Sequence, residues 1–142
     1  MLEFVERLKE LMMIGGYNQV SLGKLTGIQH TNLSDFLSAK HLPSYDNLLK
    51  LSAAFNCTIE YLLGRTDFSE EKLHPPYVFS LRLRQILKDN NISQEKLKRD
   101  LKISGSVLFK WLSGKNKPST ESLVRLADYF DCSIDYLIGT IR

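Results

Sequence analysis

Lysine and arginine are concentrated between positions 93 and 118, where the chain carries the side chains best suited to chemistry. The cations there are Lys96, Lys98, Arg99, Lys102, Lys110, Lys115 and Lys117. Only Glu95 and Asp100 offset them within this stretch. Cations at this density neutralise the phosphates of nucleic acids and release the counterions around them. We therefore expect this stretch to face a polyanion, and a merely solvated helix face is the alternative.

Residues for other kinds of chemistry are sparse. The chain has no glycine-rich phosphate loop, no G-x-S-x-G and no H-E-x-x-H. His30, His41 and His74 are not at ligand spacing, and neither Cys57 nor Cys132 belongs to a CxxC pair. We interpret the two cysteines as small buried residues of a core. The prediction is a protein that is not an enzyme and has no cofactor and no metal site.

The sequence contains an internal repeat. A shift of 75 positions pairs residues 4–64 with residues 79–139 without a gap, and 20 of the 61 pairs are identical. Such a repeat indicates one supersecondary plan used twice. We predict a first domain over 1–64, a linker over 65–78 and a second domain over 79–142. The first domain has five lysines and arginines against six acidic residues, a net charge of −1, whereas the second has twelve against seven, a net charge of +5.

Apolar residues recur every three or four positions, which predicts helices and gives no sign of a strand. Serine stands where the four later helices of the second domain should begin and can cap them. The predicted fold class is all-α, with two tandem five-helix domains. In the first domain we expect helices over about 2–13, 19–26 and 30–38, a fourth opened by Pro43-Ser44 and a fifth capped by Thr58; the serines of the second domain are Ser93, Ser104, Ser119 and Ser133.

Two helices joined by a short turn, the second with polar side chains facing outward, form a helix-turn-helix, whose second helix enters the DNA major groove. Both domains resemble the lambda-repressor/Cro (XRE-type) family of bacterial and phage regulators. The resemblance implies lambda-repressor-like domains that bind double-stranded DNA. It rests on Gln19, Leu22-Gly23, Thr26-Gly27-Ile28, Leu33, Phe36, Pro43-Ser44 and residues 61–67 in the first domain, and on Ser93-Gln94-Glu95, Leu97, Ile103-Ser104, Trp111, Gly114-Lys115, Pro118-Ser119 and residues 137–139 in the second.

The resemblance also implies roles for particular residues. The glutamine that opens the second helix of each domain would touch a phosphate, the start of the third helix would read bases, and the segment after it would lie along the DNA backbone. The DNA-binding residues predicted in the first domain are Gln19, Gln29, His30, Thr31, Asn32, Ser34, Asp35 and Lys40. Those predicted in the second domain are Gln94, Lys102, Ser104, Gly105, Ser106, Phe109, Lys110, Lys115 and Lys117.

Two positions of the second domain depart from the family pattern. Where the two helices approach most closely the family has alanine or glycine, as in Gly23, but the second domain has Lys98. The turn is normally glycine, as in Gly27, but the second domain has Lys102, which must adopt a left-handed conformation at about 1–2 kcal/mol or reshape the turn. We therefore expect the second domain to supply non-specific affinity and the first to read sequence.

Two residues at the expected interface have alternative interpretations. Asp35 can accept a hydrogen bond from cytosine N4, but it is equally suited to pair with Lys24 or Lys40, or to repel phosphate. Phe109 either touches a thymine methyl group or packs against a partner.

The combined prediction is a sequence-specific DNA-binding transcriptional regulator, and more specifically a repressor, because members of the family commonly occlude promoters. A homodimer and a single-chain pseudo-dimer, with two domains about 34 Å apart on one face of DNA, both remain open. The alternative is a protein-interaction module, antitoxin-like or adaptor, in which one repeat no longer contacts DNA. With no apolar run of about 18 residues and no secretory segment, we expect a cytoplasmic protein without a membrane partner.

Overall fold

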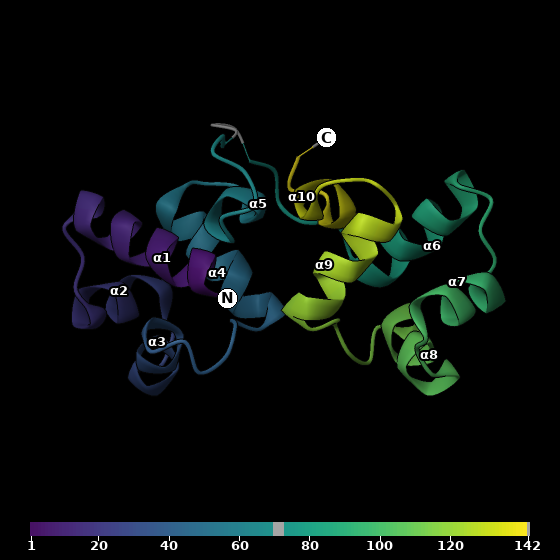
Figure 1. Cartoon of the computed structure of the whole chain (residues 1–142), viewed down its shortest axis with the longest axis horizontal. Coiled ribbons are helices and arrows are strands. Elements are labelled where there is room, and N and C mark those ends of the chain that lie inside the picture. The colour runs from purple at the N-terminus through teal and green to yellow at the C-terminus, as the bar shows by residue number, and fades with distance from the viewer. Residues whose placement is uncertain (70–72, 142) are drawn as a thin grey trace. The chain divides into compact units, whose positions relative to one another are not determined.

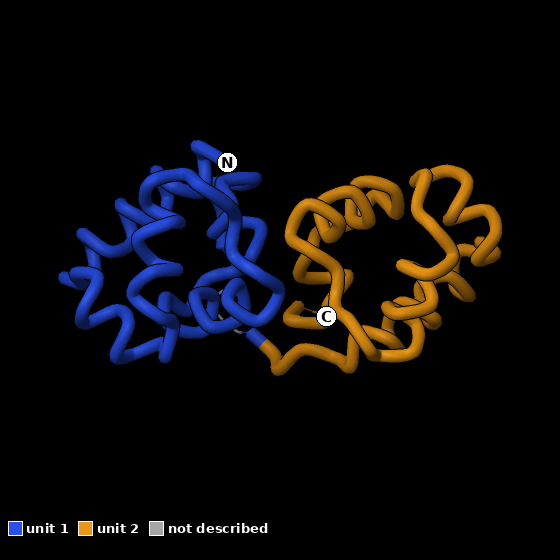
Figure 2. The backbone as a smooth tube through the Cα atoms, turned by 90° about the horizontal axis from the view of Figure 1, so that it is seen from below, with its two compact units in different colours: residues 1–73 blue, residues 74–142 orange. Residues whose placement is uncertain are grey.

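The computed structural model describes residues 1–69 and 73–141. The chain divides into two compact units, Met1–Leu73 and His74–Arg142 (Figure 2). All regular structure in the described residues is helical, with ten helices and no strand, which confirms the predicted all-α fold. The first unit contains α1 (Leu2–Gly15), α2 (Gln19–Thr26), α3 (His30–Leu37), α4 (Tyr45–Phe55) and α5 (Ile59–Leu62), and the second contains α6 (Phe79–Asp89), α7 (Gln94–Leu101), α8 (Gly105–Ser113), α9 (Thr120–Tyr129) and α10 (Ile134–Ile138) (Figure 1).

Short polar side chains begin most of these helices. The Asn18 side chain accepts a hydrogen bond from the Ser21 backbone N–H at 2.8 Å, and the Ser21 side chain accepts from the Asn18 backbone N–H in return. Such a cap satisfies backbone donors that have no partner within the helix. All four serines predicted to cap helices of the second unit do so, as do the two predicted caps of the first; the six are Ser44, Thr58, Ser93, Ser104, Ser119 and Ser133.

Left-handed backbone conformations occur at the same places in both units. Each unit has five residues with positive φ, and every one has its counterpart 75 positions away. The pairs are Gly16/Asn91, Gly27/Lys102, Ala39/Gly114, Asn56/Asp131 and Gly64/Gly139. Lys102 therefore keeps the left-handed turn, at φ 54°, instead of reshaping it. Equivalent positions have positive φ even where the residue types differ, so the backbone follows the same path in the two units.

Exchanging the turn residues is expected to have opposite effects in the two units. Lys102→Gly should raise the free energy of unfolding of the second unit by up to about 1 kcal/mol, because glycine adopts positive φ without steric strain. Gly27→Ala should lower that of the first unit by about 1–2 kcal/mol. Urea unfolding followed by circular dichroism measures both changes. A Lys102→Gly protein that is less stable than the unaltered protein would contradict the expectation.

Each unit has its own core, built from equivalent residues. Leu22 and Leu97 anchor the inner faces of α2 and α7, and both are fully buried. Phe36 and Trp111 occupy equivalent positions on α3 and α8 and are also buried, as predicted. Of the two cysteines predicted to be buried, Cys57 is buried and Cys132 is only half-buried. Since a unit of this size buries a modest fraction of its surface, every large core residue counts toward its stability.

An arginine on the first helix of each unit holds the end of that unit together. Arg7 donates to the Tyr61 carbonyl oxygen at 2.8 Å, and its guanidinium lies 3.8 Å from the centre of the Tyr61 ring. Arg82 repeats this arrangement with Tyr136, at 2.8 Å and 4.6 Å. Arg7 also donates to the Thr66 carbonyl oxygen, within the predicted linker.

Other linker residues are bonded to one unit or the other. The Ser69 hydroxyl accepts from the Thr58 N–H at 2.9 Å, and the Tyr77 N–H donates to the Ile138 carbonyl oxygen at 2.8 Å. The His74 N–H donates to the Thr140 carbonyl oxygen at 2.9 Å. Residues at both ends of the predicted 65–78 linker are therefore part of the units.

Candidate nucleic-acid interface

In the first unit, α2 and α3 meet at a tight turn made possible by two small residues. Gly27 has φ 75°, and its N–H donates to the Gly23 carbonyl oxygen. A Cβ atom on Gly23 would lie 3.3 Å from the Ile28 carbonyl oxygen, a contact tighter than most side chains tolerate. The absence of a side chain at Gly23 lets the turn pack closely on α2, whereas Gly27 adopts its left-handed conformation without strain. This geometry turns the start of α3 outward.

The first turn of α3 presents short polar side chains to solvent. Gln29 precedes the helix as its N-cap residue, and Gln29, His30 and Thr31 are all exposed. Asn32 is half-buried, and Leu33 is fully buried against the rest of the unit. Three of the predicted base-reading residues are therefore fully accessible. Amide, imidazole and hydroxyl groups of this kind can bond the edges of bases.

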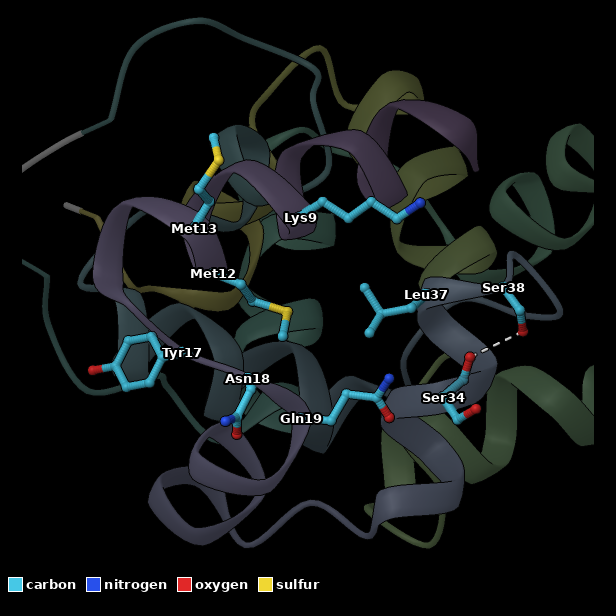
Figure 3. Close-up of a pocket in the computed structure, with 9 residues that line it drawn as sticks. All are labelled: Lys9, Met12, Met13, Tyr17, Asn18, Gln19, Ser34, Leu37 and Ser38. Carbon is cyan, nitrogen blue, oxygen red and sulfur yellow. Dashed lines mark hydrogen bonds between the residues drawn. The ribbon is translucent and has the colours of Figure 1, made fainter.

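An open hollow of about 640 Å³ lies between α1, the start of α2 and the end of α3 (Figure 3). The Gln19 side chain points across it toward Ser34 and Leu37, and its amide oxygen is buried without a hydrogen-bond partner. The hollow therefore brings together the predicted Gln19 and Ser34. It also adds Lys9, which the sequence reasoning missed, because nothing in the helical pattern of α1 distinguishes this exposed lysine from its neighbours.

The Asp35 carboxylate contacts Lys40 and His41, which lie in the segment after α3. Its Oδ1 lies 3.5 Å from Lys40 Nζ, and its Oδ2 lies 3.2 Å from His41 Nε2. The His41 ring also packs edge to face on Phe36, with 5.6 Å between ring centres. Of the interpretations that the sequence left open for Asp35, the structure favours pairing with Lys40. The predicted DNA-binding residues Lys40 and Asp35 are therefore paired with each other.

In the second unit, α8 presents a different surface. Its N-cap residue Ser104 accepts from the Val107 N–H at 3.1 Å, so the hydroxyl oxygen is already engaged in capping. Ser106 and Phe109 are exposed, and Phe109 has 62% of its surface accessible. Glutamine opens α7 as predicted. The remaining predicted residues are exposed as well: Gln94, Lys102, Gly105, Lys110, Lys115 and Lys117.

At the close approach of its helices the second unit has Lys98, where the first unit has Gly23. A Cβ atom on Gly105 would lie 3.7 Å from Lys98 Nζ and 3.9 Å from Lys98 Cδ, so the lysine side chain runs over the start of α8. In the first unit the equivalent pair is Gly23 and His30. The glycine of this pair lies on α2 in the first unit and on α8 in the second. A Cβ atom at position 105 would be at ordinary van der Waals distance from Lys98, so the lysine does not require a glycine there. Lys98 also pairs with Glu95, at 2.7 Å.

The second unit also ties α7 to α9 through polar contacts. The Tyr129 hydroxyl donates to Asp100 at 2.7 Å, and Lys96 donates to the same carboxylate at 2.9 Å. The hydrogen bond from Tyr129 has the larger effect on Asp100, and together with that from Lys96 it lowers the pKa of the Asp100 carboxyl. The same bond raises the pKa of the Tyr129 hydroxyl. Arg125 donates to the Leu101 carbonyl oxygen at the end of α7. The first unit has Leu25 and Ala54 where the second has Asp100 and Tyr129, so this brace is specific to the second unit.

The fold and the exposed third helix of each unit define a protein with two tandem helix-turn-helix units. The family model described as "Helix-turn-helix" matches residues 8–62 and again residues 83–137, and the chain belongs to this family. The double match confirms the predicted tandem repeat. Among the described residues, no helix is long and apolar enough to cross a membrane, and no group of three or more histidine, cysteine or acidic residues is placed to hold a metal ion.

Two curated proteins are similar to part of the chain. The HTH-type transcriptional regulator ImmR of Bacillus subtilis (strain 168) is 36% identical over 66 residues, which are 46% of this chain and 52% of that protein. The HTH-type transcriptional activator BcrR of Enterococcus faecalis is 37% identical over 61 residues, 43% of this chain and 30% of that protein. The match thus spans about half or less of these relatives. No solved structure is significantly similar to the chain.

Proposed function

We propose that the protein is a sequence-specific, double-stranded DNA-binding transcriptional regulator that inserts α3 and α8 in the major groove. The observation that carries the proposal is the pair of outward-facing third helices, each preceded by a left-handed turn and followed by an exposed lysine, Lys40 or Lys115. The major groove is about 12 Å wide and admits a helix. Both similar proteins are named as transcriptional regulators of the HTH type, which supports the same role here.

The contacts proposed for each unit follow from the side chains it exposes. In the first unit, Gln29, His30 and Thr31 would meet base edges, while Gln19 and Lys9, around the hollow, would face the DNA backbone. In the second unit, Lys110 and Lys115 would neutralise phosphates, and Phe109 would contact a thymine methyl group. Phosphate contacts supply affinity, whereas base contacts supply sequence preference. The second unit would therefore contribute most of the non-specific affinity.

We further propose that the protein represses transcription by occupying promoter DNA. One chain would provide two unequal recognition helices, so a single-chain pseudo-dimer would select an asymmetric operator with half-sites about 10 base pairs apart. A homodimer that uses one unit per chain would instead select a symmetric operator. One of the similar proteins is named as an activator, so a reporter gene with the operator at its promoter is needed to determine the sign of regulation.

The test is selection from a random-sequence duplex library by the purified full chain at several salt concentrations. Enrichment of an asymmetric site with two half-sites supports DNA regulation by a pseudo-dimer, and a symmetric site supports a homodimer. Weak, salt-sensitive binding without enrichment would contradict sequence-specific regulation. The adaptor interpretation, in which one repeat binds another protein, would then be favoured.

A further inference from the structure

One position near the end of the third helix carries opposite charge in the two units. Asp35 in the first unit corresponds to Lys110 in the second, 75 residues later, and Lys40 corresponds to Lys115. His41 corresponds to Asn116. With neutral histidine, these three positions sum to zero charge in the first unit and to +2 in the second. The difference includes Lys110 and Lys115, which are proposed to neutralise phosphates in the second unit.

The contacts differ in the same way. In the first unit Asp35 Oδ1 lies 3.5 Å from Lys40 Nζ, and Asp35 Oδ2 lies 3.2 Å from His41 Nε2. In the second unit neither Lys110 nor Lys115 forms an ion pair with any residue that the structure describes. Lys110 and Lys115 are therefore available to phosphates, whereas Lys40 already has an acidic neighbour within its own unit.

We propose that Asp35 limits the affinity of the first unit for DNA by neutralising Lys40, and does not read a base. The proposal rests on the proposed DNA-binding function. Exposed ion pairs contribute at most about 1 kcal/mol to stability, so Lys40 can leave Asp35 at little cost. The Asp35 carboxylate nevertheless stays beside the DNA backbone and offsets the positive charge of Lys40. The first unit then holds DNA only where its exposed α3 side chains find matching bases.

The test compares Asp35→Asn with the unaltered protein in binding to random-sequence duplex between about 50 and 200 mM salt. Removing the carboxylate should free about one phosphate-neutralising charge and steepen the slope of log K against log salt by about 0.9. The gain in affinity should therefore be about 3.5-fold larger at the low salt concentration than at the high one. Asparagine has nearly the same shape as aspartate, so the thermal unfolding midpoint should change little.

Lys110→Gln is the matched variant at the equivalent position of the second unit, and it should make the slope shallower by about 0.9. An unchanged slope in Asp35→Asn would overturn the proposal. A change of the selected sequence at a single C·G pair in that variant would also overturn it, because Asp35 would then be a base reader. If the unaltered protein binds no DNA, the proposed function fails together with this inference, whereas DNA binding with an unchanged slope overturns the inference alone.

Discussion

Leu108→Ala is expected to lower the free energy of unfolding of the second unit by about 2–5 kcal/mol. Leu108 lies on the inner face of α8, is 2% exposed, and precedes the buried Trp111 by one helical turn. The cost combines lost burial with the cavity left behind. A unit of this length is stable by only about 3–9 kcal/mol. The substitution should therefore remove a large share of the stability of the second unit.

Trp111 is the only tryptophan of the chain and lies in the second core, so its fluorescence reports on that unit. In a urea titration, the fluorescence transition of Leu108→Ala should move to a much lower urea concentration. The matched variant is Leu33→Ala, at the equivalent and fully buried position of α3. It should lower the helical circular dichroism of the first unit but leave the Trp111 transition in place. Equal displacement of that transition by both variants would mean that the two units unfold as one.

Reversing two charges of the second unit, in Lys110→Glu/Lys115→Glu, is expected to weaken binding to random-sequence DNA at low salt by at least about tenfold. Lys110 lies on α8 and Lys115 just after it, and both are exposed and lack an ion-pair partner among the described residues. Loss of two phosphate contacts should also make the slope of log K against log salt shallower by about 1.8. Fluorescence anisotropy of a labelled duplex at several salt concentrations measures both effects.

Lys50→Glu on the exposed side of α4 provides the control, because it changes the net charge as much as each single reversal. It should weaken DNA binding only slightly. If Lys50→Glu weakens binding as much as Lys110→Glu alone, the effect would come from net charge and not from a docking face on α8. If the double reversal leaves DNA affinity unchanged, the second unit does not contact DNA, and the adaptor interpretation would be favoured.

Local sequence signals were sufficient to predict the helices. Ser44 and Thr58 cap helices of the first unit as expected, and the four later helices of the second begin after serines. Caps, glycine turns and apolar periodicity depend on residues within one or two helical turns, so they can be recognised without knowing the fold. The internal repeat extended each assignment from one unit to the other. The left-handed residues recur in register because both units follow one backbone path.

The sequence also indicated which residues would surround the third helices, but not which other side chains they would contact. It left Asp35 with several interpretations, and the contacts to Lys40 and His41 depend on side-chain directions where the chain leaves α3. Lys9 joins the hollow around Gln19 only because α1 packs beside the start of α2. Neither arrangement has a signature in the spacing of residues along the chain.

The order of amino acids alone determines two properties of this protein. Membership of the helix-turn-helix class is a pattern of residues along the chain. The unequal charge of the two units is a sum over the residues of each. The course of the Lys98 side chain over the start of α8, and the bond of Tyr129 to Asp100, required the packed structure. In each case the partners come from different helices. Their distance is set by how closely those helices approach, which depends on every side chain packed between them.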